Sequence, residues 1–243
     1  MVARGETFPD EARWIISGYV RAGYQTAGRG QTGNGWESEA GKNLLCSILL
    51  DISQWHLTFA PFTLNVAVCV ALHRMVSRQL SADSEPLTIK WPNDLYWGDK
   101  KLAGILIENL LDCHEVKYSI AGIGLNVNQT EWKSDAPNPI SLKQITGCDY
   151  DLDGLMNELL DELDKALTEP AWEYYKARLY RKDGYWPFVE REVSTAPTMN
   201  ADHDTEGVFM AHIEEVLPTG EFVVKDQKGE IRTYHFKQIR YVL

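Results

Sequence analysis

Apolar residues in the first part of the chain follow two different periods. The runs 14–24 and 44–52 are short and bounded by polar or glycine-rich stretches, which predicts two β-strands. The second run is almost continuously apolar, so we expect a central strand with both faces covered. After Pro61, apolar residues recur at helical spacing as far as Leu80, which predicts a helix packed against the sheet.

The middle of the chain carries a strong hairpin signal. Two β-rich runs, 88–97 and 100–108, flank the pair Gly98-Asp99, which favours a tight turn between antiparallel strands. A further run, 116–125, predicts another strand, and the two glycines within it remove side chains where another group must approach the sheet closely. Adjacent strands of this kind favour a mostly antiparallel sheet.

The pattern of apolar and polar residues changes twice in the second half of the chain. Residues 128–139 contain two prolines and no periodicity, which is typical of a long loop or lid. An amphipathic helix is predicted over 151–167 and a shorter one over 172–179. From 188 onward, five short alternating runs predict a small β-barrel or roll. The order of elements indicates an α+β fold with a mixed, mostly antiparallel sheet and flanking helices, in two domains: 1–185 and 186–243.

Composition restricts the class of protein. The chain has 243 residues, of which 44% are apolar and 24% charged, as in soluble globular proteins. A net charge of −11 argues against a nucleic-acid partner. No apolar stretch approaches the roughly 18 residues that would span a membrane, and the start lacks the apolar segment of a secretory signal. The four cysteines are isolated and predict free thiols in a reduced cytoplasm, and the six histidines show no metal-ligand spacing.

The stretch 25–36 concentrates the candidate chemistry. It contains several glycines, Arg29 and amide or hydroxyl side chains, so its backbone N–H groups and one guanidinium would suit a phosphate or a carboxylate; a mobile surface loop is the alternative. Gly28, Gly30 and Gly33 also match the dinucleotide-binding pattern G-x-G-x-x-G. That pattern requires a helix directly after the third glycine within a βαβ unit, and only ten residues separate Gly33 from the next apolar run. We therefore reject dinucleotide binding.

Two lysines on the predicted hairpin extend this picture. Lys90 and Lys101 would lie on its two arms, and Lys90 stands among apolar residues. Burying an unpaired ammonium is costly, so Lys90 must have an anionic partner. That partner could be Asp94 or Glu108, or it could be the phosphate of a ligand if Lys90, Lys101 and Arg29 converge.

Four blocks of sequence, in order, resemble the biotin protein ligases. They are Gly28-Arg29-Gly30-x-x-Gly33 with Trp36 behind it, the K-W-P-N-D block at 90–94, the K-L-A-G-I block at 101–105 and Gly122-Ile123-Gly124-Leu125-Asn126-Val127-Asn128. The resemblance covers residues 14–145. It implies a class II synthetase-like catalytic domain followed by a small SH3-like β-barrel.

The resemblance also implies a two-step acyl transfer. ATP and biotin would form biotinyl-AMP and pyrophosphate, with Mg²⁺ on the phosphates. A lysine of a biotin carboxyl carrier protein domain would then attack the acyl carbon; a homodimer is allowed. Asp94 would help the acceptor lysine to lose its proton, because a lysine amine has a pKa near 10.4; a turn-capping aspartate is the alternative. The magnesium has no firmly assigned protein ligand, although Asn126 would lie near it.

The resemblance further implies which residues act in catalysis and which contact biotin and ATP. Four residues are implied to be catalytic: Arg29, Lys90, Asp94 and Lys101. Biotin would be contacted by Gln25, Gly28, Arg29, Gly30, Gln31, Lys101, Gly104, Gly122 and Gly124. ATP would be contacted by Arg29, Lys90, Asn93, Asn126 and Trp132.

Two features depart from the family pattern. No Ser-Thr-Asn motif precedes Gln25, where the family normally holds the ureido ring of biotin, so a neighbouring strand is expected to be left as a sheet edge. We also expect no N-terminal DNA-binding domain, in agreement with the acidity of the chain, and repressor activity is not predicted. A lipoate- or octanoyl-transferring relative and a biotin-binding protein without turnover remain alternatives.

Overall fold

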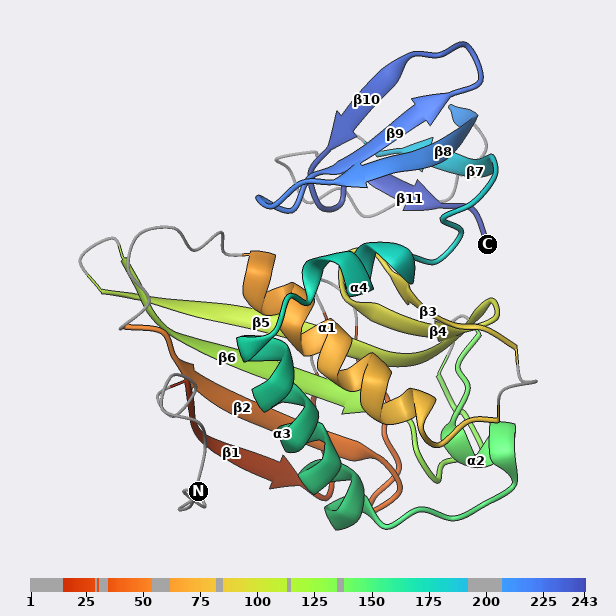
Figure 1. Cartoon of the computed structure of the whole chain (residues 1–243). Helices are drawn as coiled ribbons and strands as arrows, with labels where there is room; N and C mark the ends of the chain where they lie inside the picture. Colours follow the sequence, from red (N-terminus) through yellow and green to blue (C-terminus); the bar gives the residue numbers. More distant parts are fainter. Residues whose placement is uncertain are drawn as a thin grey trace.

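Two antiparallel sheets and a layer of helices make up the protein (Figure 1). The computed structural model describes residues 15–28, 30, 35–53, 62–81, 85–112, 115–134, 138–191 and 207–243. The strands of the first sheet are β1 (Ile16–Ala22), β2 (Leu44–Asp51), β3 (Leu87–Lys90), β4 (Asp94–Trp97), β5 (Lys100–Asp112) and β6 (Glu115–Leu125). The helices are α1 (Phe62–Ser77), α2 (Leu142–Thr146), α3 (Leu152–Thr168) and α4 (Trp172–Ala177). The second sheet contains β7 (Trp186–Glu190), β8 (Val208–Val216), β9 (Phe222–Asp226), β10 (Ile231–Tyr234) and β11 (Ile239–Tyr241).

The first sheet has the strand order β1-β2-β6-β5-β4-β3, and all its strand pairs are antiparallel. Helices α1 and α3 cover one face of it (Figure 1). The expectation that β2 is covered on both faces was wrong: β2 is central, but Ser47 on it is exposed. The α+β class is confirmed, and β1 forms an edge of the sheet among the described strands, as expected.

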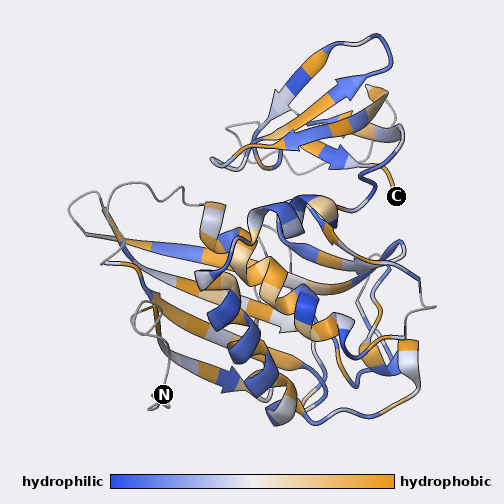
Figure 2. Ribbon diagram, viewed as in Figure 1, coloured by the Kyte–Doolittle hydropathy of each residue, from blue (hydrophilic) through white to orange (hydrophobic). Residues whose placement is uncertain are grey.

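Helix α1 is buried over most of its surface, because it lies between the sheet and helices α3 and α4. Val66, Val68 and Val70 are all buried there, although β-branched residues at this spacing favour strands by intrinsic propensity. Tertiary packing therefore decides the helical state. Helix α3 instead shows one apolar stripe and a polar outer face (Figure 2), and Asp151 caps its first turn by accepting hydrogen bonds from the N–H groups of Asp153 and Gly154.

The region 88–108, which was expected to form one hairpin of two strands, contains the three strands β3, β4 and β5. Gly98 does form the turn between β4 and β5, with a positive φ of 54°. The first arm, however, is broken at Trp91–Asn93 into two antiparallel strands, β3 and β4. Lys90 and Lys101 therefore do not lie on adjacent strands, because β4 separates β3 from β5.

The second sheet packs against the turn that separates β3 from β4. The Trp91 indole stacks on Phe222 with ring centroids 4.8 Å apart, and its Nε1 donates a hydrogen bond to the Gly220 carbonyl at 3.1 Å. From the helical layer, Asn65 and Tyr175 donate hydrogen bonds to the Pro92 carbonyl at 2.8 and 2.9 Å. Both layers thus hold the chain immediately before Asp94.

None of the helices in the described part of the chain is long and apolar enough to cross a membrane. The expected small C-terminal β unit is present as a five-stranded antiparallel sheet with the order β10-β9-β8-β7-β11. Its aromatic core includes Phe188 and Phe222, which are fully buried.

A buried histidine joins α1 to its neighbours. His73 is 4% exposed; its Nε2 lies 3.0 Å from the Leu87 carbonyl and its Nδ1 3.1 Å from the Tyr174 hydroxyl. The neutral ring, with the proton on Nε2, satisfies both contacts. Burial lowers the pKa of His73 from 6.5 to about 4, and the charges of Arg178 and Arg74 act in the same direction.

We expect this histidine to make the protein acid-sensitive. Between pH 6.5 and about 4 the unfolded chain binds a proton that the folded chain rejects, so stability is lost as pH falls through this window. At 1.36 kcal/mol per pKa unit, the full effect is about 3 kcal/mol. Urea unfolding of the wild type at about pH 7 and about pH 5 should show this slope, and His73→Gln should remove most of it. An equal slope in both proteins would contradict the assignment.

Candidate active site

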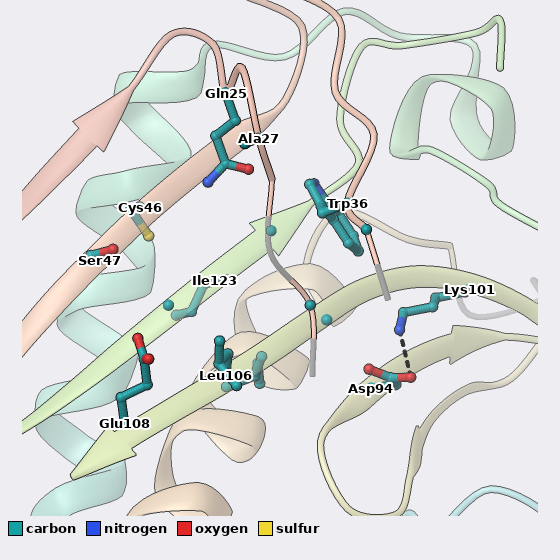
Figure 3. Close-up of a pocket in the computed structure, with 16 residues that line it drawn as sticks. Gln25, Ala27, Trp36, Cys46, Ser47, Asp94, Lys101, Leu106, Glu108 and Ile123 are labelled. Atoms are coloured by element: carbon teal, nitrogen blue, oxygen red, sulfur yellow. Dashed lines mark hydrogen bonds and ion pairs between the residues drawn. The ribbon is translucent and has the colours of Figure 1, made fainter. Parts of the chain in front are cut away.

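A cavity of about 350 Å³ opens on the face of the first sheet that the helices leave uncovered (Figure 3). This volume lies within the usual range of small-molecule sites. Its lining comes from the segment after β1 and from β2, β4, β5 and β6: Gln25, Ala27, Gly30, Gly35, Trp36, Cys46, Ser47, Asp94, Lys101, Gly104, Ile105, Leu106, Glu108, Gly122, Ile123 and Gly124.

An ion pair stands at one end of the cavity. Lys101 Nζ lies 2.6 Å from Asp94 Oδ2, and the two side chains are 32% and 25% exposed. Asp94 is the cross-strand partner of Gly104, and a Cβ at position 104 would lie 3.3 Å from Asp94 Oδ1. The backbone of Lys101 is fixed on its other side, because its N–H donates to Asn138 and its carbonyl accepts from Ile140. Both charged groups are therefore held where a ligand could reach them.

Trp36 covers the glycines beside this ion pair. A Cβ added at Gly124 would come within 2.5 Å of Trp36 Cε2, and one at Gly104 within 3.3 Å of Cζ3. The Trp36 N–H donates to the Gly28 carbonyl at 3.0 Å, and a Cβ at Gly28 would meet the Trp36 carbonyl oxygen at 2.3 Å. Glycine at 28 therefore lets the two ends of the glycine-rich segment close on each other. A tryptophan after this segment, together with glycines on two later strands, is the sequence signal that could have indicated this contact.

Lys90 does not line the cavity. Its Nζ lies 3.0 Å from the Tyr96 hydroxyl and 5.3 Å from the centroid of the Tyr241 ring, at the joint with the second sheet. Burial lowers the pKa of Lys90 to about 8; Asp94 opposes this shift and Lys101 adds to it. Of the two alternatives for Lys90, the ion pair to Asp94 or Glu108 is not formed: Asp94 pairs with Lys101, and Lys90 contacts aromatic rings. A ligand phosphate as its partner stays a prediction.

The two asparagines of the predicted nucleotide site are buried. Asn93 donates from Nδ2 to the Ile105 carbonyl at 2.8 Å, which ties the β3–β4 turn to β5. Asn126 donates from Nδ2 to the Ile140 carbonyl at 3.0 Å, whereas its Oδ1 has no hydrogen-bond partner among the described residues. Neither lines the cavity. A buried acceptor without a partner is costly unless a ligand or ion satisfies it.

The predicted loop over 128–139 is fastened to the segment that follows the glycine-rich stretch. The Glu37 carboxylate accepts hydrogen bonds from the N–H groups of Lys133 and Ser134 at 2.8 and 2.7 Å. Partial burial would raise the pKa of Glu37, but these hydrogen bonds outweigh it and leave the pKa below its ordinary value. Trp132 beside them is half-buried, with an indole N–H that lacks a described acceptor.

The structure thus sorts the expected site residues into three groups. The cavity brings together Gln25, Gly30, Asp94, Lys101, Gly104, Gly122 and Gly124. Gly28 is not part of the lining, but its carbonyl accepts a hydrogen bond from Trp36, which is. Outside its lining lie Lys90, Asn93, Asn126 and Trp132. Arg29 and Gln31 fall outside the described residues, so convergence of Arg29 with the two lysines stays a prediction. The pattern did not single out Trp36, Ser47 and Leu106 as cavity residues, or Glu108 as more than a partner for Lys90.

Comparison with known proteins identifies the family. Residues 11–128 match the model of the biotin/lipoate A/B protein ligase family. The chain is 32% identical over 172 residues to the bifunctional ligase/repressor BirA of Escherichia coli, which covers 70% of this chain and 49% of BirA. It spans about half the length of that relative.

Two further similarities cover more of both chains. The structure matches a biotin protein ligase from Aquifex aeolicus in complex with biotin and ATP, with a TM-score of 0.69 and 22% identity over 95% of this chain and 93% of the other. At this identity the match establishes the fold. A biotin--[acetyl-CoA-carboxylase] ligase from Paracoccus denitrificans is 30% identical over 188 residues, 74% of this chain and 73% of that protein. The chain therefore belongs to the biotin/lipoate A/B protein ligase family, within its biotin protein ligases.

Proposed function

We propose that this protein is an ATP-dependent ligase that forms biotinyl-AMP from biotin and ATP and transfers biotin to a lysine of a biotin carboxyl carrier protein. Membership of the biotin protein ligases supports this activity. The observation that carries it is the Lys101–Asp94 ion pair at one end of a glycine-floored cavity. The pair supplies a cation for a substrate carboxylate and a carboxylate for proton removal at the same place.

In the first step, a biotin carboxylate oxygen attacks the α-phosphorus of ATP, and the bond to pyrophosphate breaks. Lys101 donates to the biotin carboxylate and keeps it at the phosphate, and it then holds the acyl-phosphate oxygen. Negative charge develops on phosphoryl oxygens, so fixed cations lower the barrier. Arg29 and Lys90 are the further cations that we assign to the phosphates; Lys90 would gain proton affinity from the anion.

In the second step, the amine of an acceptor lysine attacks the acyl carbon, and AMP leaves. Such an amine is protonated near pH 7 and must lose its proton before or during attack. Asp94 lies 2.6 Å from Lys101, so it stands beside the acyl group that Lys101 holds. We assign Asp94 as the group that accepts this proton.

Magnesium would enter with the nucleotide. The described residues contain no group of three or more His, Cys, Asp or Glu side chains that could hold a metal ion. Mg²⁺ binds substrate phosphates and often only one or two protein groups. The buried Asn126 Oδ1, which has no partner among the described residues, supports a role of this residue beside the metal or the nucleotide. When bound, the ion would neutralise charge on the phosphates.

We assign residues 1–185 to catalysis and 186–243 to a supporting β unit. The contact of Tyr241 with Lys90, at 5.3 Å, supports a role for the second unit at the nucleotide side. Trp132 and Asn93 complete our assignment of that side. We place the reaction in the cytoplasm, where ATP and the carrier protein are available.

The activity can be tested directly with purified protein, ATP, Mg²⁺ and an apo carrier domain. We expect pyrophosphate release that depends on biotin, and biotin attachment to the carrier domain. Release with lipoate or octanoate instead would assign the chain to the other branch of the family. Tight biotin binding without pyrophosphate would make it a binding protein.

Lys101→Ala should nearly abolish adenylate formation. Removing a fixed cation from charged oxygens in a cavity costs about 10²–10³-fold in rate. Pyrophosphate release in a single turnover is the measurement, with thermal unfolding to verify the fold. Lys100→Ala is the matched control, because Lys100 is exposed on the same strand and does not line the cavity. Near-normal release by Lys101→Ala would remove Lys101 from the site.

Asp94→Asn should impair transfer more than adenylate formation. Loss of a positioned proton acceptor costs about 10²–10⁴-fold in the step it serves. Transfer of preformed biotinyl-AMP to the carrier domain, measured in a single turnover, should fall by this amount and recover partly at higher pH, where the acceptor amine is less protonated. A loss confined to pyrophosphate release would contradict the assigned role.

A further inference from the structure

Two polar side chains remain unused at the end of the cavity away from the ion pair. Ser47 on β2 and Glu108 on β5 both line the cavity and are both exposed (Figure 3). Neither forms a side-chain hydrogen bond or an ion pair with another residue that the structure describes. In the close-up the Glu108 carboxylate points toward the side of the cavity on which Ser47 lies. These groups are thus available to a ligand.

Strand register fixes where these side chains stand. Along β5, Gly104, Leu106 and Glu108 share the cavity face, because side chains alternate along a strand. Lys101 reaches the level of Gly104, where a Cβ would lie 3.4 Å from its Cε. Four residues along an antiparallel strand span about 14 Å. When the length of the Glu108 side chain is subtracted from this distance, the remaining space accommodates several methylene groups and a small ring.

At Gly122 the floor of the cavity carries no side chain. Gly122 is the cross-strand partner of both Ser47 on β2 and Leu106 on β5. A Cβ at position 122 would meet only the Leu106 carbonyl at 3.5 Å and the Leu106 Cβ at 3.9 Å, which are ordinary contacts. Nor does Gly122 have a positive φ. Packing within the protein therefore does not require glycine here, whereas a ring lying on the sheet would.

We propose that Ser47 and Glu108 recognise the cyclic urea of biotin over the Gly122 floor and select biotin against carboxylic acids with apolar tails. This assignment rests on the proposed function, which places the biotin carboxylate at Lys101. The negative charge of Glu108 excludes a carboxylate from its end of the cavity. A neutral group with N–H donors satisfies it, and hydrogen bonds to ionised groups are the stronger kind.

Each group has a defined partner on the urea. The Glu108 carboxylate accepts a hydrogen bond from a ureido N–H, and the Ser47 hydroxyl donates to the ureido carbonyl oxygen. Gln25, which lines the cavity near its rim, adds an amide. A dithiolane or an alkyl tail offers neither donor nor acceptor, so binding it would desolvate Glu108 and Ser47 without replacement. Sites built to hydrogen-bond a substrate reject analogues that lack the group by large factors.

The test uses Glu108→Gln and Ser47→Ala in the full chain, with Glu158→Gln on α3 as the carboxylate-to-amide control on the helical side. In biotin-dependent pyrophosphate release, we expect KM for biotin to rise about 10–100-fold in the cavity variants, while KM for ATP and kcat change little. Desthiobiotin, which keeps the urea, should follow biotin. Octanoate should gain relative to biotin in Glu108→Leu.

Calorimetric binding of biotin without ATP separates this assignment from the proposed activity. Weaker biotin binding by both cavity variants supports the urea site even if no pyrophosphate is released. Unchanged biotin binding in both variants overturns it, even if the wild type is an active ligase. A parallel rise of both KM values, or equal weakening in Glu158→Gln, also overturns it, because a general loss of structure would then explain the effect.

Discussion

The Lys101–Asp94 ion pair is the interaction on which the rest of the site depends. At 2.6 Å and about one-third to one-quarter exposed, it adds little to stability, because pairs that remain open to solvent are worth about 0–1 kcal/mol. Its importance is positional. Asp94 lies on β4 and Lys101 on β5, so the register of these two strands sets the distance between the two groups to which we assign substrate binding and proton removal.

That register is maintained from several directions. Pro92 accepts hydrogen bonds from α1 and α4, Asn93 bonds to β5, and Trp91 stacks on Phe222 of the second sheet. The C-terminal sheet therefore stabilises the turn that presents Asp94, although none of its residues lines the cavity.

Sequence patterns predicted those elements in which local signal and packing agree. Helix α3 and the Gly98 turn were confirmed because residues close in sequence determine their positions. The α1 helix was confirmed because its apolar period matches the packing that stabilises it. The three-residue break at Trp91–Asn93 was not predicted, although Pro92, Asn93 and Asp94 are turn-forming residues, because the Gly98-Asp99 signal was interpreted as the only turn of the region. The turn at the break is held by residues 65, 175 and 220, which are distant in sequence. The burial of Lys90 against Tyr96 and Tyr241 likewise depends on the second sheet.

The sequence alone could not distinguish the roles of the three cavity glycines Gly104, Gly122 and Gly124. All three looked alike as small residues on strands, yet Trp36 occupies the space above Gly104 and Gly124, while nothing in the described protein occupies the space above Gly122. A steric reason within the fold therefore exists for two of them and is lacking for the third. Fold similarity at 22% identity cannot supply that reason, because the same scaffold serves ligases of different acids. The chemistry around Gly122 supplies the argument. Ser47 and Glu108 have no side-chain partners among the described residues, which supports our proposal of a polar ring as the occupant, because an apolar tail would leave both unsatisfied.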